Sequence, residues 1–120
     1  MITDEFDAAL PIEVKQASRL FGNEWLIPLQ HVGQCIDVAS TKGIAVLGLE
    51  ILKILDDGML GTENYSGYEV KDSSEWQRFV RENNKHARDF IEKHRFGEGY
   101  GYILTTTSQE EFRNLRVSNA

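Results

Sequence analysis

Cysteine and proline are scarce in this chain of 120 residues, which contains one cysteine and two prolines. With Cys35 alone no intramolecular disulfide can form, as is typical of proteins in a reducing compartment. The prolines, Pro11 and Pro28, lie in different segments, and no Gly/Ser/Pro-rich linker divides the chain. We therefore expect a single domain over residues 1–120.

Long apolar runs are also missing. The most apolar segment, Ile44–Leu55, is interrupted by Glu50 and Lys53 and is too short to cross a bilayer. The first ten residues carry acidic side chains where a secretory signal needs positive charge followed by an apolar stretch. The sequence therefore predicts a cytoplasmic protein with no membrane span.

Positive charge is in deficit, because 13 Lys and Arg residues oppose 19 Asp and Glu residues, a formal net charge of -6. Such a balance disfavours nonspecific attraction to a polyanion, so direct binding of nucleic acid is not expected. The first 70 residues contain 11 acidic and 4 basic side chains, whereas the last 50 contain 8 and 9. An acidic first part is consistent with a solvated face that aids solubility or with a surface for a partner.

The apolar residues that are present follow helix and strand spacing. The expected helices cover residues 12–21, 28–40, 75–94 and 108–116, and the expected strands cover residues 44–55, 65–70 and 100–106. A turn signal at residues 56–58 and a loop through Gly61 and Asn64 would make the first two strands antiparallel neighbours. The order α-α-β-β-α-β-α predicts an α+β domain with a small, mainly antiparallel sheet packed with helices.

Two of these segments predict which side chains are buried. Strict alternation in residues 44–55 gives one face of Ala45, Leu47, Leu49 and Ile51 and another of Ile44, Val46, Leu52 and Ile54. Helical spacing in residues 75–94 gives a buried face of Trp76, Phe79, Val80, Ala87, Phe90 and Ile91.

His31 and Cys35 are the sharpest chemical signal in the sequence. Four residues apart on an expected helix, they would share a side, as in a thiolate–imidazolium pair or a pair of metal ligands. No second His or Cys cluster supplies further ligands. We expect Cys35 to pack in the core and His31 to be solvated, and we predict no catalytic residues, metal or cofactor. A small thiol enzyme that uses this pair is kept as an alternative.

Two other patterns imitate ligand-binding loops. Residues 96–102, FGEGYGY, have glycine spacing, but they follow a helix and open a strand, the reverse of a phosphate loop. We expect Gly97 to terminate that helix. The DDG sequence at 56–58 lacks the acidic ladder of a calcium loop and predicts a turn.

Residues 43–70 read GIAVLGLEILKILDDGMLGTENYSGYEV, and the helix at Trp76 and the segment GYILTTTSQEEF follow. Through this stretch, above all LGLE at 47–50 and YSGY at 65–68, the chain resembles the small immunity proteins of bacterial contact-dependent inhibition and related polymorphic toxin systems. The resemblance covers roughly the last two-thirds of the chain. It implies a cytoplasmic protein that binds the C-terminal toxin domain of its own system, often a nuclease, and blocks its active site or substrate surface.

The resemblance and the charge distribution together predict a partner surface in the acidic first part. Acidic side chains would speed the encounter with a basic nuclease domain, and aromatic side chains would hold the complex. The predicted partner-binding residues are Glu50, Asp56, Asp57, Glu63, Tyr65, Tyr68 and Glu69. An adaptor that recognises a peptide or another protein is a second alternative.

Overall fold

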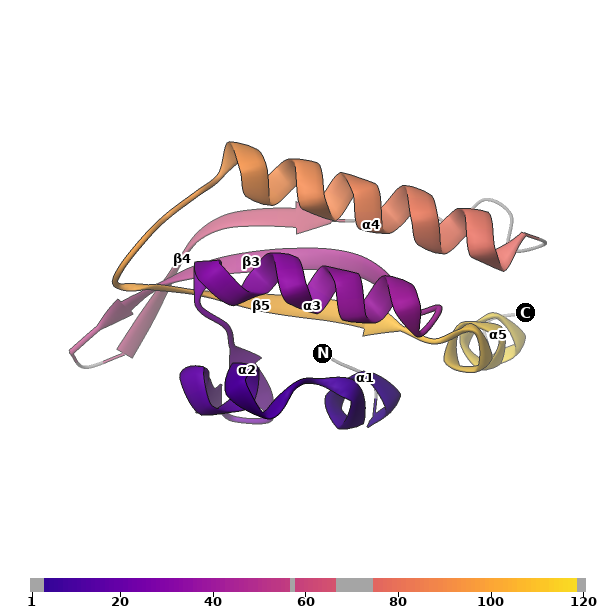
Figure 1. Ribbon diagram of the computed structural model, residues 1–120, viewed down its shortest axis with the longest axis horizontal. Coiled ribbons are helices and arrows are strands. Elements are labelled where there is room, and N and C mark those ends of the chain that lie inside the picture. Colours follow the sequence, from indigo (N-terminus) through magenta and orange to yellow (C-terminus); the bar gives the residue numbers. More distant parts are fainter. Residues whose placement is uncertain (1–3, 57, 67–74, 119–120) are drawn as a thin grey trace.

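The chain folds into helices that pack on antiparallel strands (Figure 1). The computed structural model describes residues 4–56, 58–66 and 75–118. The elements in order are α1 (Asp4–Ala9), α2 (Ile12–Ala17), β1 (Arg19–Phe21), β2 (Glu24–Leu26), α3 (Leu29–Thr41), β3 (Ala45–Leu55), β4 (Gly58–Ser66), α4 (Trp76–Lys93), β5 (Tyr100–Thr107) and α5 (Gln109–Ser118). Strands β4, β3 and β5 form one antiparallel sheet in that spatial order, and β1 and β2 form a separate hairpin. The predicted α+β class, with helices packed on an antiparallel sheet, is confirmed.

The first third of the chain contains elements that the periodicity did not reveal. The helix predicted over residues 12–21 ends at Ala17, and residues 19–21 pair with residues 24–26 instead. Gly22, with φ 61°, makes the tight turn between these strands, where a residue with a β-carbon would be strained. Helix α1 was not predicted at all.

Strand β4 begins earlier than predicted. It starts at Gly58, directly after the turn, and pairs with β3 as far as Ser66, so the expected loop through Gly61 and Asn64 is wrong. Two glycines within GMLGTEN suggested a loop, whereas pairing with β3 extends this segment. The antiparallel pairing of the two strands is confirmed, and residues 67–70 of the predicted strand lie outside the described residues.

A β-bulge at Leu47 overturns the predicted division of β3 into two faces. Val46 lies opposite Thr106 and Gly48 opposite Thr105, so Leu47 is an extra residue that shifts the alternation by one. Val46 therefore joins Leu49 and Ile51 in the main core. Ala45 belongs to a second cluster, against which Leu47 packs, and Leu52 belongs to a third.

The main core forms where α1, α2, α3 and the second half of α4 meet β3 and β5. Its largest fully buried side chains are Tyr102, Phe6, Ile27, Ile36, Ile44, Ile51, Leu104, Val14, Val32, Val46 and Cys35. The first turns of α4 supply the second cluster, in which Trp76, Phe79 and Val80 surround Ala45 and Phe112 of α5 packs alongside. The predicted buried face of α4 is confirmed except at Phe90, which is only half-buried.

Asn84 is a buried polar residue of α4 that fixes the start of β3. Its Oδ1 accepts the backbone N–H of Val46 at 2.8 Å, and its Nδ2 donates to the carbonyl of Ile44 at 3.0 Å and to the hydroxyl of Ser40 at 2.9 Å. The side chain thus joins α3, α4 and β3 next to the bulge, where the regular ladder is interrupted.

The β1–β2 hairpin is attached to the outer part of the sheet through β5. Ile27 and Tyr102 exchange two backbone hydrogen bonds of 2.9 Å, and Leu26 forms the third cluster with Leu52 and Ile103. A β-carbon at position 101 would lie 2.9 Å from Cδ2 and 3.1 Å from Cβ of Leu26, so any larger residue there would force Leu26 to shift. The hairpin therefore sits close against the sheet.

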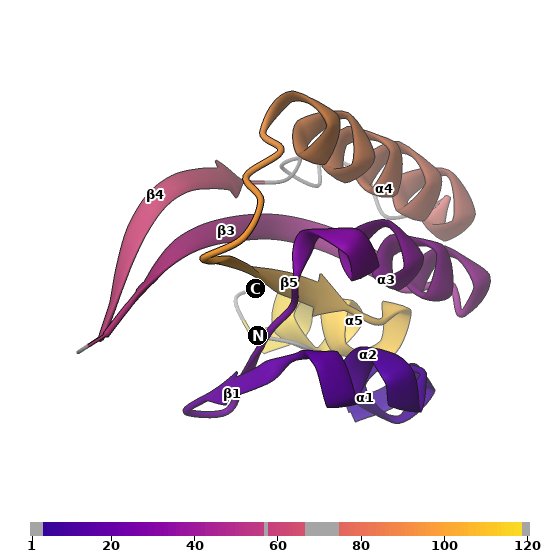
Figure 2. The same ribbon diagram turned by 60° about the vertical axis from the view of Figure 1, so that its left-hand side comes forward.

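Past this attachment the β3–β4 hairpin extends away from the body of the molecule (Figures 1 and 2). The end of β3 lies at one end of the longest dimension, 44 Å, and α5 lies at the other (Figure 1). The N–H of Ile54 still donates to the carbonyl of Gly99 at 2.7 Å, beyond the last ladder pair of β5. Helix α4 ends at Lys93, four residues before Gly97, so the prediction that Gly97 terminates the helix is wrong. The glycine of this segment that adopts a positive φ, 88°, is Gly99.

Candidate functional site

The predicted pair of His31 and Cys35 does not form a reactive centre in α3. Cys35 is fully buried in the main core, as predicted, and burial raises the pKa of its thiol to about 12. The imidazole of His31 is partly exposed rather than fully solvated, and its Nδ1 lies 3.4 Å from Oε1 of Gln34. At neutral pH the Cys35 thiol is therefore protonated, and a protonated thiol is a poor nucleophile.

The described residues contain neither a cluster of metal ligands nor a helix suited to cross a membrane. Within them no three His, Cys, Asp or Glu side chains are grouped so that they could hold a metal ion. None of the described helices combines the length and the apolar character needed to cross a bilayer.

The predicted partner surface falls on the β3–β4 hairpin as far as the structure describes it. Glu50 is exposed in the middle of β3, and Asp56 is exposed in the turn that follows. In β4 the backbone of Glu63 lies opposite Ile51 and that of Tyr65 lies opposite Leu49. Asp57, Tyr68 and Glu69 lie outside the described residues.

Sequence reasoning missed exposed apolar side chains in both hairpins. Leu20 and Phe21 of β1 are 62% and 49% exposed, and Leu55 at the end of β3 is 41% exposed. The first two were placed in a helix, which concealed their exposure. The segment RLF-GN-EWL, two short runs around Gly-Asn, is the hairpin signal that could have revealed them.

The β1–β2 hairpin is held in place by polar contacts with the first two helices. Trp25 of β2 donates its indole N–H to Oδ1 of Asp7 in α1 at 2.8 Å. The other oxygen of that carboxylate lies 3.6 Å from Nζ of Lys15 in α2. This chain of contacts fixes the hairpin, and with it Leu20, which lies opposite Trp25 in the β1–β2 register.

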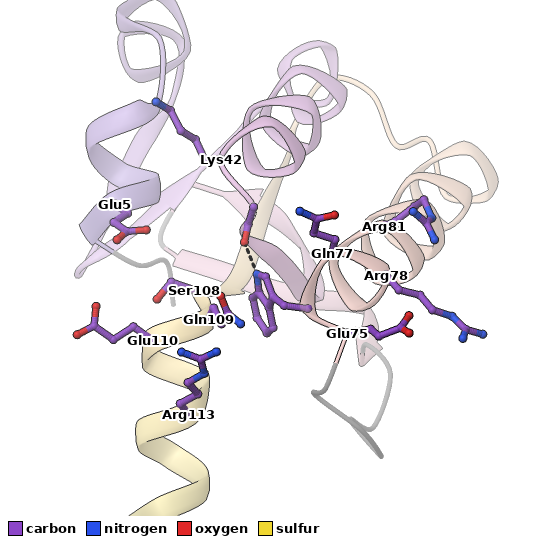
Figure 3. Close-up of a pocket in the computed structure, with 12 residues that line it drawn as sticks. Glu5, Lys42, Glu75, Gln77, Arg78, Arg81, Ser108, Gln109, Glu110 and Arg113 are labelled. Carbon is purple, nitrogen blue, oxygen red and sulfur yellow. Dashed lines mark hydrogen bonds between the residues drawn. The ribbon is translucent and has the colours of Figure 1, made fainter.

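A hollow lined by residues of α1, α4 and α5 lies at the other end of the molecule (Figure 3). Its volume is about 780 Å³, and it lies between the end of α3 and the first turns of α4 and α5. Trp76 in its wall donates its indole N–H to the carbonyl of Gly43 at 2.7 Å. The charged residues that line it are Glu5, Lys42, Glu75, Arg78, Arg81, Glu110 and Arg113.

These charges do not converge on one point. In Figure 3 Arg113 points toward Ser108 and Gln109, whereas Arg78 and Lys42 point away from them. Arg78 is also bound to Glu82, with Nε and Oε1 3.0 Å apart. With both signs present and several side chains directed outward, the hollow has no single charge character that would select an anion or a cation.

A smaller hollow of about 330 Å³ lies between α3 and α4. Arg88 on its rim donates to the carboxylate of Asp37 and to the carbonyl of Gly33. These bonds join the two helices, so Arg88 has a structural role in this groove.

Comparison with protein-family models, with curated proteins and with solved structures finds no match to this chain. The interpretation of function therefore depends on the geometry of the described residues and on the motifs at 43–70. Of the features above, the β3–β4 hairpin carries the exposed predicted partner residues Glu50 and Asp56 together with the exposed Leu55.

Proposed function

We propose that this protein is a cytoplasmic immunity protein that binds a cognate bacterial toxin domain and blocks its active site or substrate surface. The observation that carries the proposal is the projecting β3–β4 hairpin, on which Glu50 and Asp56 are exposed. The resemblance at residues 43–70 supports the same role, because those residues build β3 and β4. The expected partner is a basic nuclease domain.

Glu50 and Asp56 are the described acidic side chains of the hairpin, and both are exposed to a partner. Among the described residues neither Glu50 nor Asp56 belongs to an ion pair. Fifteen charged side chains lie in the first 70 residues, and 11 of them are acidic. A partner of opposite potential would be steered toward this part of the protein.

The thiol-enzyme alternative requires an accessible thiolate at Cys35. Burial of Cys35, which raises the pKa of its thiol to about 12, weighs against that alternative. The adaptor alternative predicts the same kind of surface but a different partner. The two binding hypotheses are distinguished by the partner rather than by the fold.

Coexpression with the toxin domain encoded beside this gene tests the proposal. The protein should restore growth of cells that make the toxin domain, and the purified pair should elute together in size-exclusion chromatography. Cell death and separate elution, with a folded protein by circular dichroism, would contradict the proposal. A gene neighbourhood without a toxin would favour the adaptor.

A further inference from the structure

Helices α3 and α4 lie side by side (Figures 1 and 2), and the hollow of about 330 Å³ between them, which we call the α3–α4 groove, has a positive lining. Its charged residues are Asp37 of α3 and Arg81, Lys85 and Arg88 of α4. The carboxylate of Asp37 accepts a hydrogen bond from Arg88, so these two charges compensate each other. The charge that remains in the groove is that of Arg81 and Lys85.

These two cations have no counter-ion within the protein as described. Among the residues that the structure places, neither Arg81 nor Lys85 forms an ion pair. Both are exposed, and because they are four residues apart on α4 they lie on the same face of that helix. Arg78, one turn earlier, is instead bound to Glu82. In a protein of net charge -6, the α3–α4 groove is therefore a local region of uncompensated positive charge.

The rest of the groove offers apolar surface rather than unsatisfied polar groups. Ile36 of α3 and Val80 of α4 line it. The amide of Asn84, which also lines it, is already bonded to the hydroxyl of Ser40 and to backbone groups at the start of β3. A ligand in the groove therefore meets apolar side chains and two exposed cations.

A small anion or a nucleic acid fits this lining poorly. Phosphate sites use the backbone N–H groups of a helix N-terminus, whereas the N–H groups in the middle of α4 are bonded within the helix. Two exposed side chains alone would hold an ion only weakly in water. None of the described residues that line the groove is aromatic, so unpaired bases would find nothing to stack on.

We propose that the α3–α4 groove binds an acidic segment of a partner protein. An apolar side chain of that segment packs against Ile36 and Val80, and carboxylates on either side of it pair with Arg81 and Lys85. Two carboxylates one turn apart on a helix are separated by about 6 Å along its axis, the same spacing as that of the two cations on α4. The groove is on α3 and α4 rather than on the β3–β4 hairpin, so the inference does not depend on the proposed function.

Fluorescence anisotropy with a short labelled peptide, in which glutamates flank a leucine, tests the proposal. The double variant Arg81→Gln with Lys85→Gln should raise the Kd of the peptide at least about fivefold, because both ion pairs are lost. Lys93→Gln with Arg95→Gln is the matched control, since it removes the same charge from exposed positions at the end of α4, outside the groove. It should leave the Kd within about twofold, apart from the general effect of charge that salt screens.

The same titrations contain the results that would overturn the proposal. A peptide with serine in place of leucine should bind more weakly, and equal binding would mean that no apolar side chain enters the groove. Absence of saturable binding, or equal loss in both double variants, would show that the groove does not recognise the peptide. Displacement by inorganic phosphate at constant ionic strength, or tighter binding of oligothymidylate, would assign the groove to another anion. Self-association that only the groove variant abolishes would assign it to a second copy of the chain. Both pairs of positions are exposed, so thermal melting should hardly change in either variant.

Discussion

Strand β3 has two halves with different surroundings. In the inner half, Ala45–Leu49, four of five residues are buried and the fifth, Leu47, is half-buried. In the outer half, Glu50–Leu55, three of six residues are exposed. The helices cover the inner half and reach Ile51, whereas Leu52 of the outer half packs against Leu26 of the β1–β2 hairpin and Ile103 of β5.

One strand therefore contributes to the hydrophobic core with its inner half and to the exposed surface with its outer half. Burial and the Asn84 contacts hold the inner half, so a change there should alter the stability of the free protein. The exposed side chains of the outer half contribute little to folding, so a change there should alter binding. The predictions on Phe79, Asn84 and Asp56 below test this division of β3 into a half that determines stability and a half that determines binding.

The largest effect is expected at Phe79, which packs against Ala45 at the start of the inner half. Phe79→Ala should lower the free energy of unfolding by about 3–5 kcal/mol, because the buried ring leaves a cavity. Phe90→Ala is the comparison, and it should cost less because Phe90 is only half-buried. Urea titration followed by circular dichroism measures both; a loss below about 1 kcal/mol at Phe79 would contradict its burial.

The next effect is expected at Asn84, whose amide bonds the N–H of Val46 in the inner half and the carbonyl of Ile44 just before it. Asn84→Ala should cost about 1–3 kcal/mol for each group left without a partner. Hydrogen exchange should show lost protection at the amide of Val46, which donates to Asn84 Oδ1. Asn84→Asp keeps an acceptor for that amide but removes the donor to Ile44, so restored protection at Val46 alone would confirm the assignment. Unchanged protection in Asn84→Ala would argue against it.

The sequence predicted the long elements and missed those fixed by close contacts. Helix α4 and strand β3 were found because their apolar residues recur with a regular period over many residues. The bulge at Leu47 was not found, because it depends on how β3 pairs with β5. The three-residue strands β1 and β2 carry too few residues for a period, and their pairing rests on Gly22 and on the contact of Leu26 with Gly101.

The candidate site was predicted in part for the same reason. Acidic composition indicated Glu50 and Asp56, and both are exposed. Exposure of Leu20 and Phe21 could not be predicted from hydrophobicity, since apolar residues are placed inside by default. The burial of Cys35 was predicted from its residue type, and the structure adds the effect of that burial on its pKa.

A smaller effect is expected from Cys35 at alkaline pH. The thiol pKa rises from its ordinary value of 9.0 to about 12 in the folded protein, because burial disfavours the thiolate. Between these values the unfolded chain loses this proton and the folded chain keeps it, so stability falls as pH rises above 9. At pH 10 the wild type should have lost about 1.4 kcal/mol more stability, relative to pH 8, than Cys35→Ala. Parallel pH profiles of the two proteins would show that the thiol does not titrate in this way.

The smallest change in stability is expected in the outer half, at Asp56. Asp56→Lys should alter the unfolding free energy by less than about 0.5 kcal/mol, because the side chain is exposed and outside any ion pair among the described residues. Its effect should appear in the association rate with the toxin domain, which should fall and depend less on salt. Glu110→Lys makes the same charge change in α5, at the opposite end of the molecule, and should slow association less. Equal slowing by both variants would mean that net charge alone steers the partner. Slowing by Asp56→Lys alone, with dissociation unchanged, would assign the encounter to the outer half of β3.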